Sequence, residues 1–151
     1  PAGSVIPGKV QFKKDLTMVM AAHNLPYVAQ TAPMTNFKDL YDKSEKAIYT
    51  PGPAFMNVMA PCPRGWRYDT PQLMDIIKLA VDSCVWPLYE VIEGEFKLTY
   101  RPKVKVPVAD YLKSQGRFRH VFKGPDSEER LADIQAEVDR RWENLLKLCG
   151  E

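Results

Sequence analysis

The hydrophobic run over residues 55–60 is interrupted only by Asn57 and shows no alternation of apolar and polar positions. A short run of this kind, bounded by proline-rich segments, is typical of a strand buried on both faces of a parallel sheet. The strand cannot continue through Pro61 and Pro63, because proline fixes φ and lacks the backbone N–H donor. Cys62 is therefore expected in a rigid loop at the carboxyl end of this strand, where open α/β sheets bind their ligands.

Apolar residues recur at helical spacing in four further segments, and each stripe predicts an amphipathic helix with its apolar face buried. The stripe residues are Phe12, Leu16, Val19, Met20 and His23; Phe37, Leu40, Tyr41, Ser44, Ala47 and Ile48; Leu73, Ile76, Ile77, Ala80, Val81 and Cys84; and Leu131, Ile134, Val138, Trp142, Leu145 and Cys149. Start signals precede three of the helices: Asn36 as an N-cap, Thr70 followed by Pro71, and Asp126 with Glu129 as a capping box.

The remaining segments predict short strands and connections. Residues 27–31 form a candidate strand, and residues 88–92 and 95–101 flank a Glu-Gly pair in the pattern of a β-hairpin at a sheet edge. Residues 102–108 are expected to form an extended strap, followed by a short helix over 108–115. The order of helices and strands predicts an α/β fold: a parallel sheet with flanking helices, an antiparallel edge hairpin and a C-terminal helix.

Residues 116–122 alternate aromatic or apolar side chains with basic ones. We interpret this pattern as a strand that docks on the domain with its basic face in solvent. Contact with an anion or a partner protein is the functional alternative. Residues 1–10 are rich in proline and glycine and are expected to form a loop.

Composition narrows the class of protein. The 151 residues are enough for one domain with its own core, and 45% hydrophobic with 26% charged residues is ordinary for a soluble globular protein. The net charge is +2 and both signs are interspersed, so no nucleic-acid-binding surface is indicated. Three cysteines without framework spacing fit a reducing cytoplasm, and we expect neither a membrane span nor a signal peptide.

Cys62 carries the strongest chemical signal. A sulfur held between two prolines has one preferred direction, which suits a metal ligand, whereas a buried inert thiol is the structural alternative. One cysteine cannot complete a four-ligand site, and Cys84 and Cys149 lie in no CxxC pair. A nucleophilic thiol is a third alternative, with Arg64 as the only nearby residue that could activate it. Nucleotide-binding, hydrolase and zinc-protease motifs are absent from the sequence, and the two histidines lie far apart.

Four segments resemble the β subunit of pyruvate:ferredoxin oxidoreductase (pyruvate synthase), and they occur in the order seen in that family. They are residues 14–30 (KDLTMVMAAHNLPYVAQ), 60–66 (APCPRGW), 86–90 (WPLYE) and 111–120 (YLKSQGRFRH). The resemblance implies a sheet of the thiamine-diphosphate-binding type. Residues 1–101 would be the C-terminal half of that α/β domain, and residues 102–151 a C-terminal extension, strap plus helix, packed on it.

The resemblance also implies an activity. Enzymes of this family oxidatively decarboxylate a 2-oxoacid, using coenzyme A, thiamine diphosphate with Mg, and iron–sulfur clusters, and they pass the electrons to ferredoxin. Pyruvate is the implied substrate, while 2-oxoisovalerate and 2-oxoglutarate stay open, as does the physiological direction. By its motif, Cys62 matches the fourth cysteine of the [4Fe-4S] cluster of the β subunit, which favours a metal ligand over an inert thiol.

Two features of the family are missing from this sequence: the three early cluster cysteines and the Gly-Asp-Gly…Asn motif that holds Mg and the diphosphate. The chain is therefore expected to be the C-terminal half of the subunit. Alone, it should bind neither cluster nor thiamine diphosphate and be inactive, and it should expose a sheet edge and apolar faces that the rest of the subunit covers. The alternative is a non-catalytic module that binds partner subunits through the hairpin, the strap and the basic segment.

Overall fold

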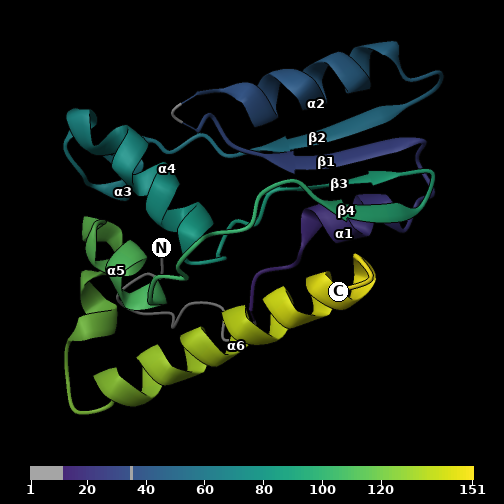
Figure 1. The fold of residues 1–151 in the computed structure, drawn as a ribbon. Helices are drawn as coiled ribbons and strands as arrows, with labels where there is room; N and C mark the ends of the chain where they lie inside the picture. The colour runs from purple at the N-terminus through teal and green to yellow at the C-terminus, as the bar shows by residue number, and fades with distance from the viewer. Residues whose placement is uncertain (1–11, 35) are drawn as a thin grey trace.

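The computed structural model describes residues 12–34 and 36–151, so the loop expected for residues 1–10 lies outside the described residues. A four-stranded sheet flanked by helices confirms the α/β class (Figure 1). The strands are β1 (Tyr27–Thr31), β2 (Ala54–Val58), β3 (Tyr89–Ile92) and β4 (Glu95–Leu98). The α-helices are α1 (Leu16–Ala21), α2 (Lys38–Tyr49), α3 (Pro63–Trp66), α4 (Leu73–Asp82), α5 (Val108–Lys113) and α6 (Ser127–Leu148), and the 3₁₀ helices are η1 (Thr70–Gln72) and η2 (Gly116–Phe122).

The sheet has the strand order β2-β1-β3-β4 and mixes two pairing modes. β1 pairs in parallel with β2, whereas β3 is antiparallel to both β1 and β4, which confirms the predicted edge hairpin. β2 has exposed ends and a half-buried centre, so the prediction that it is buried on both faces is wrong. The reason is its edge position: among the described residues, β2 has a neighbouring strand on one side only.

Helices cover both faces of the sheet (Figure 1). On one face, α1 and α6 lie over a buried cluster formed by Val28, Tyr89, Val91 and Leu145. α2 lies on the opposite face and packs mainly against β1 and β2. The sheet is therefore the middle of three layers in this half of the molecule.

A second buried cluster lies where α4 meets α5, η2 and the first half of α6. Its buried members are Ala32, Met59, Ile76, Ile77, Ala80, Val81, Leu88, Val108, Tyr111, Leu112 and Val121. The predicted stripes of α4 and α6 are confirmed, since the α6 residues of the stripe pack against one or the other cluster. Residues of the strap and extension thus share a core with the segment that precedes them.

α2 turns its polar side to the sheet. Lys43 is 1% exposed, whereas Tyr41, Ile48 and Tyr49 are 69%, 76% and 77% exposed. The prediction that the stripe containing Tyr41 and Ile48 is buried is therefore wrong. Hydrogen bonds from Lys43 to the Gln30 carbonyl of β1 and to the Thr99 hydroxyl set the rotation of the helix.

α1 likewise exposes most of its predicted apolar stripe. Apart from Met20, the residues of that stripe lie at the surface, and Thr17 faces the sheet instead. Thr17 Oγ1 donates a hydrogen bond to Gln30 Oε1 at 2.7 Å and accepts one from Asn57 Nδ2 at 3.0 Å. The orientation of this short helix is therefore set by the buried Thr17 hydroxyl, which bonds side chains of β1 and β2. The spacing of its apolar residues does not set it.

The segment 116–122 is a 3₁₀ helix, so the predicted docking strand is wrong. Gln115, Phe118 and Val121 are buried or half-buried and recur every three positions, which is the period of a 3₁₀ helix. The alternation of basic and aromatic residues has the two-residue period of a strand, but the segment does not fold as one. This helix lies directly against the loop that carries Cys62.

Helix starts are predicted to within a residue or two. α2 has Phe37 and not Asn36 at its N-cap, and Asp69 with Gln72, not Thr70, forms the capping box that opens η1. At α6 the N-cap is Asp126 as predicted, but its side chain makes no capping hydrogen bond. These differences follow from loop geometry, which decides which oxygen reaches the first free N–H groups.

Candidate functional site

Cys62 lies between the end of β2 and the one-turn helix α3, at the surface. It is the N-cap of α3, and its Sγ accepts a hydrogen bond from the Gly65 amide at 3.4 Å. The rigid loop that the two prolines predict is thus a tight turn whose second proline starts the helix. An exposed thiol excludes the interpretation of Cys62 as a buried core residue.

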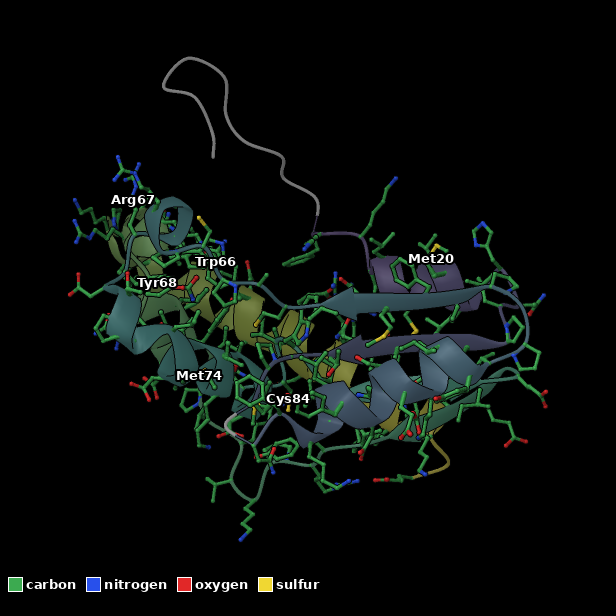
Figure 2. The ribbon with its side chains drawn as sticks, turned by 90° about the horizontal axis from the view of Figure 1, so that it is seen from above. Met20, Trp66, Arg67, Tyr68, Met74 and Cys84 are labelled. Atoms are coloured by element: carbon green, nitrogen blue, oxygen red, sulfur yellow. The ribbon has the colours of Figure 1, made fainter. Side chains whose placement is uncertain are left out.

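The loop is held by contacts with aromatic residues. Tyr68 Oη donates a hydrogen bond to the Pro61 carbonyl at 3.1 Å, and burial, followed by the charge interaction with Cys62, raises the pKa of the Tyr68 phenol. The Arg117 guanidinium stacks on the Trp66 ring, with its Cζ 3.7 Å from the ring centroid. Figure 2 shows Trp66, Arg67 and Tyr68 together at one end of the molecule. The loop is therefore fixed from two sides.

Gly116 makes the closest of these contacts. Its amide donates to the Arg67 carbonyl at 2.9 Å, and a Cβ at this position would lie 2.8 Å from Arg67 Cβ. Only glycine allows the two backbones to approach so closely. η2, whose sequence is basic and aromatic, is therefore joined to the Cys62 loop, a contact that sequence reasoning missed because the two segments lie far apart in the chain.

Cys62 belongs to no cluster of potential metal ligands in the described part of the chain. There, no group of three or more His, Cys, Asp or Glu side chains is placed to hold a metal ion. Cys84 is buried, and burial raises the pKa of its thiol to about 11, while Cys149 is half-buried at the end of α6. The exposed sulfur of Cys62, with an N–H directed at it, fits one ligand position of an iron–sulfur cluster. Further ligands would have to come from outside the described residues.

The geometry gives no support to a thiol nucleophile. Among the described residues, the only hydrogen-bond partner of Cys62 Sγ is the Gly65 amide, so no base is placed to activate it. His23 lies at the end of α1, where its Nδ1 donates to the Val19 carbonyl at 2.7 Å.

A polar network between α2 and the sheet is the second notable arrangement. Lys43 Nζ donates to the Gln30 carbonyl, Asp39 Oδ2 and Thr99 Oγ1, each at 2.8 Å. Asp39 also accepts hydrogen bonds from the hydroxyls of Thr31 and Thr99. The spacing of Asp39 and Lys43 on one helix face was the available sequence signal.

The same network continues to Glu90, which is fully buried on β3. Glu90 accepts hydrogen bonds from Tyr27 Oη at 3.0 Å and from Lys46 Nζ at 2.6 and 2.8 Å. Burial, with the Glu90 charge adding to the effect, raises the pKa of the Tyr27 phenol. A cavity of about 510 Å³ lies alongside, but three lysines that line it are paired with carboxylates. The network therefore positions α2 and leaves these three lysines no free charge for an anion.

Across the described residues, no helix has the length and apolar character needed to cross a membrane. No family model matches the chain. Known relatives do match it over almost its whole length. Pyruvate synthase subunit PorB of Thermotoga maritima is 45% identical over 148 residues, which is 98% of this chain and 45% of that protein.

Two other relatives extend the comparison. Pyruvate synthase subunit PorB of Methanocaldococcus jannaschii is 43% identical over 145 residues, covering 96% of this chain and 47% of that protein. Ketoisovalerate oxidoreductase subunit VorB of Pyrococcus abyssi is 38% identical over 139 residues, covering 91% and 43%.

The chain is thus similar over nearly its whole length to subunits named for pyruvate synthase and for ketoisovalerate oxidoreductase. It is a homologue of pyruvate synthase subunit PorB, which confirms the resemblance predicted from its sequence. The chain spans about half the length of the curated relatives that it matches.

Proposed function

We propose that this chain is part of the β subunit of a pyruvate:ferredoxin oxidoreductase. In the intact enzyme, pyruvate and coenzyme A would be converted to acetyl-coenzyme A and carbon dioxide, and the two electrons released would reduce two one-electron ferredoxins. The observation that carries the proposal is the 45% identity to a pyruvate synthase subunit over 98% of the chain. The presence of a ketoisovalerate oxidoreductase subunit among the relatives keeps 2-oxoisovalerate as the second candidate substrate.

Cys62 is the residue of this chain to which we assign a role in electron transfer. Its thiolate would be one ligand of a [4Fe-4S] cluster, and a bound cluster supplies storage and transfer of single electrons. The Gly65 N–H already directed at the sulfur would remain available to the ligand, and hydrogen bonds to cluster sulfurs are one determinant of reduction potential. Pro61 and Pro63 fix the backbone on both sides of the ligand.

Residues around Cys62 would shield the site from water. Trp66, half-buried under the Arg117 guanidinium, and Tyr68, bonded to the Pro61 carbonyl, cover one side of the loop. Thiamine diphosphate and Mg would be bound by the half of the subunit that lies outside the region matched by this chain. This chain alone is therefore proposed to be inactive.

The decisive experiment measures iron and acid-labile sulfide in the full-length subunit, prepared anaerobically, beside its Cys62→Ser variant. Loss of the cluster, or its conversion to a three-iron form, is expected, together with loss of ferredoxin reduction. Cys84→Ser and Cys149→Ser are the matched controls, because neither thiol is fully exposed. Iron content unchanged in Cys62→Ser would contradict the ligand assignment. Relative kcat/KM values for pyruvate and 2-oxoisovalerate would settle the substrate.

A further inference from the structure

The Cys62 loop depends on outside support for its shape. Helix α3, which follows Cys62, has only four residues, and a single helical turn is not stable by itself. Two of its amides point back to Cys62: the Gly65 amide donates to Sγ at 3.4 Å, and the Trp66 amide donates to the Cys62 carbonyl at 2.9 Å. The direction of the sulfur therefore depends on the residues that hold this turn in place.

The 3₁₀ helix η2 holds the end of this turn through two neighbouring residues. The Arg117 guanidinium lies over the Trp66 ring, with Cζ 3.7 Å from the ring centroid. The preceding residue, Gly116, donates its amide to the Arg67 carbonyl at 2.9 Å. One contact fixes a side chain of α3 and the other fixes the backbone of the residue that follows it. The turn therefore cannot rotate or move away from η2 without losing both contacts.

Arg117 is itself held in one orientation. Its Nε donates to Gln115 Oε1 at 2.9 Å, and its Nη2 donates to Tyr111 Oη at 3.4 Å. Tyr111 and Gln115 are 4% and 1% exposed, and they are joined because Gln115 Nε2 donates to the Tyr111 carbonyl at 2.8 Å. The Phe118 ring centroid lies 4.5 Å from Arg117 Cζ. The guanidinium is thus a fixed link between the buried part of the C-terminal extension and the Trp66 ring.

The charge of Arg117 makes this contact costly. The side chain is half-buried, and burial lowers the pKa of its guanidinium. In the part of the chain that the structure describes, no carboxylate forms an ion pair with it, whereas Arg130, Arg140 and Arg141 of α6 each have one. A partly desolvated charge without a counter-ion costs free energy, which an apolar side chain against Trp66 would avoid. The arginine is better explained by the planar, hydrogen-bonded contact that a guanidinium makes.

We propose that Arg117 is a positioning residue for the Cys62 sulfur and acts through Trp66. The guanidinium fixes the Trp66 ring, the ring holds α3, and α3 holds the Cys62 thiolate in the direction that a cluster ligand needs. This inference rests on the proposed function, because the thiolate is directed at iron only if Cys62 is a ligand. Residues that orient metal ligands change metal affinity by about 10–100-fold when they are substituted. The extension therefore takes part in holding the cluster through a residue that does not ligate it.

The test uses the full-length subunit, prepared anaerobically, and five variants of it. Arg117→Met removes the planar cation, and Arg117→Lys keeps the charge but loses the planar group. Trp66→Leu removes the ring, and the double variant Arg117→Met with Trp66→Leu closes a double-mutant cycle. Arg119→Met is the matched control, because it removes an exposed arginine from the same 3₁₀ helix. The first measurement is the rate at which cluster iron passes to a ferrous-iron chelator. The second is hydrogen exchange of the α3 amides by mass spectrometry, which needs no cluster.

Arg117→Met is expected to lose iron about tenfold faster than the parent subunit, with faster exchange of the α3 amides and an altered electron paramagnetic resonance spectrum of the reduced cluster. Arg117→Lys should not restore the parent rate, because lysine lacks the planar fork that bonds Tyr111 and Gln115. Arg119→Met should behave like the parent. The double variant should lose iron no faster than the faster of its two single variants, since both substitutions break the same contact.

Parent-like iron release in Arg117→Met would overturn the inference, and so would an equally fast release in Arg119→Met. Additive effects in the cycle would exclude the route through Trp66, and full rescue by Arg117→Lys would replace positioning by a simple charge effect. Thermal unfolding identifies any variant that does not fold; should Arg117→Met be one, Arg117→Lys decides by the same criteria. Failure of the proposed function gives a different result: Cys62→Ser keeps its iron, while exchange of the α3 amides still becomes faster in Arg117→Met.

Discussion

Lys43→Met should destabilise this protein far more than the substitution of the exposed Lys38 on the same helix. Lys43 is 1% exposed and makes three hydrogen bonds, so its removal leaves the Asp39 carboxylate without a counter-ion and the Gln30 carbonyl without that donor. Removing one partner of a buried ion pair costs about 3–5 kcal/mol, because the remaining charge is left uncompensated. For a chain of this length that corresponds to a fall in Tm of roughly 6–20 °C.

α2 supplies its own matched control. Lys38 and Asp42 form an ion pair with the same i,i+4 spacing, but their side chains are 72% and 50% exposed. Lys38→Met should therefore cost only about 0.3–0.5 kcal/mol. Urea unfolding followed by circular dichroism gives the global change, and hydrogen exchange of the α2 amides gives the local one. Equal costs for the two substitutions would refute the conclusion that the buried network holds α2 on the sheet.

Three further predictions follow from single contacts. Gly116→Ala should lower the free energy of unfolding by about 1–3 kcal/mol, because the new Cβ would lie 2.8 Å from Arg67 Cβ. Gly65→Ala should be tolerated, because its new Cβ would lie 3.6 Å from the nearest atom, Cys62 Sγ. Similar costs for the two substitutions in thermal unfolding would contradict the argument that only glycine fits at position 116. Iodoacetamide at neutral pH should modify the exposed Cys62 in the native chain long before Cys84, because Cys84 is buried and burial raises the pKa of its thiol to about 11. Equal rates of modification, measured by mass spectrometry, would contradict the placement of Cys84 in the core. Burial alone would raise the pKa of Glu137, but hydrogen bonds and charge interactions with Arg141 and Arg140 outweigh it and hold that pKa below the usual 4.5. The stability contributed by Glu137 is therefore present above pH 4.5 and lost as the pH falls through the lower folded-state pKa, so Glu137→Gln should flatten the acid side of a Tm-against-pH curve.

The sequence predicted the elements better than their orientation. The stripe of α4 faces the core as periodicity requires, and Ile76, Ile77, Ala80 and Val81 are buried there in a hydrophobic cluster. In α2 the same reasoning fails, since the sheet offers polar partners for Lys43 that come from β1 and from the segment after β4. Periodicity measures where apolar residues cluster on a helix, and tertiary hydrogen bonds decide which side turns inward.

The candidate site was predictable in part. Proline on both sides of Cys62 indicated a fixed loop, and the loop is fixed, but the chain offers no sequence signal that Gly116 would contact Arg67.

The strand order has a kinetic consequence. β3 and β4 are joined by a two-residue turn, with Glu93 and Gly94 at positive φ of 50° and 87°, and such a hairpin closes in about 1–10 μs. The pairing of β1 with β3, in which Tyr27 lies opposite Ile92, has to close a much longer loop that contains α2, β2 and α4. Because long loops delay non-local pairing, the hairpin should form first and then wait for β1. During that interval the open edge of β3 is a template for any other extended chain, so the folding of this protein should be most vulnerable to concentration before β1 arrives.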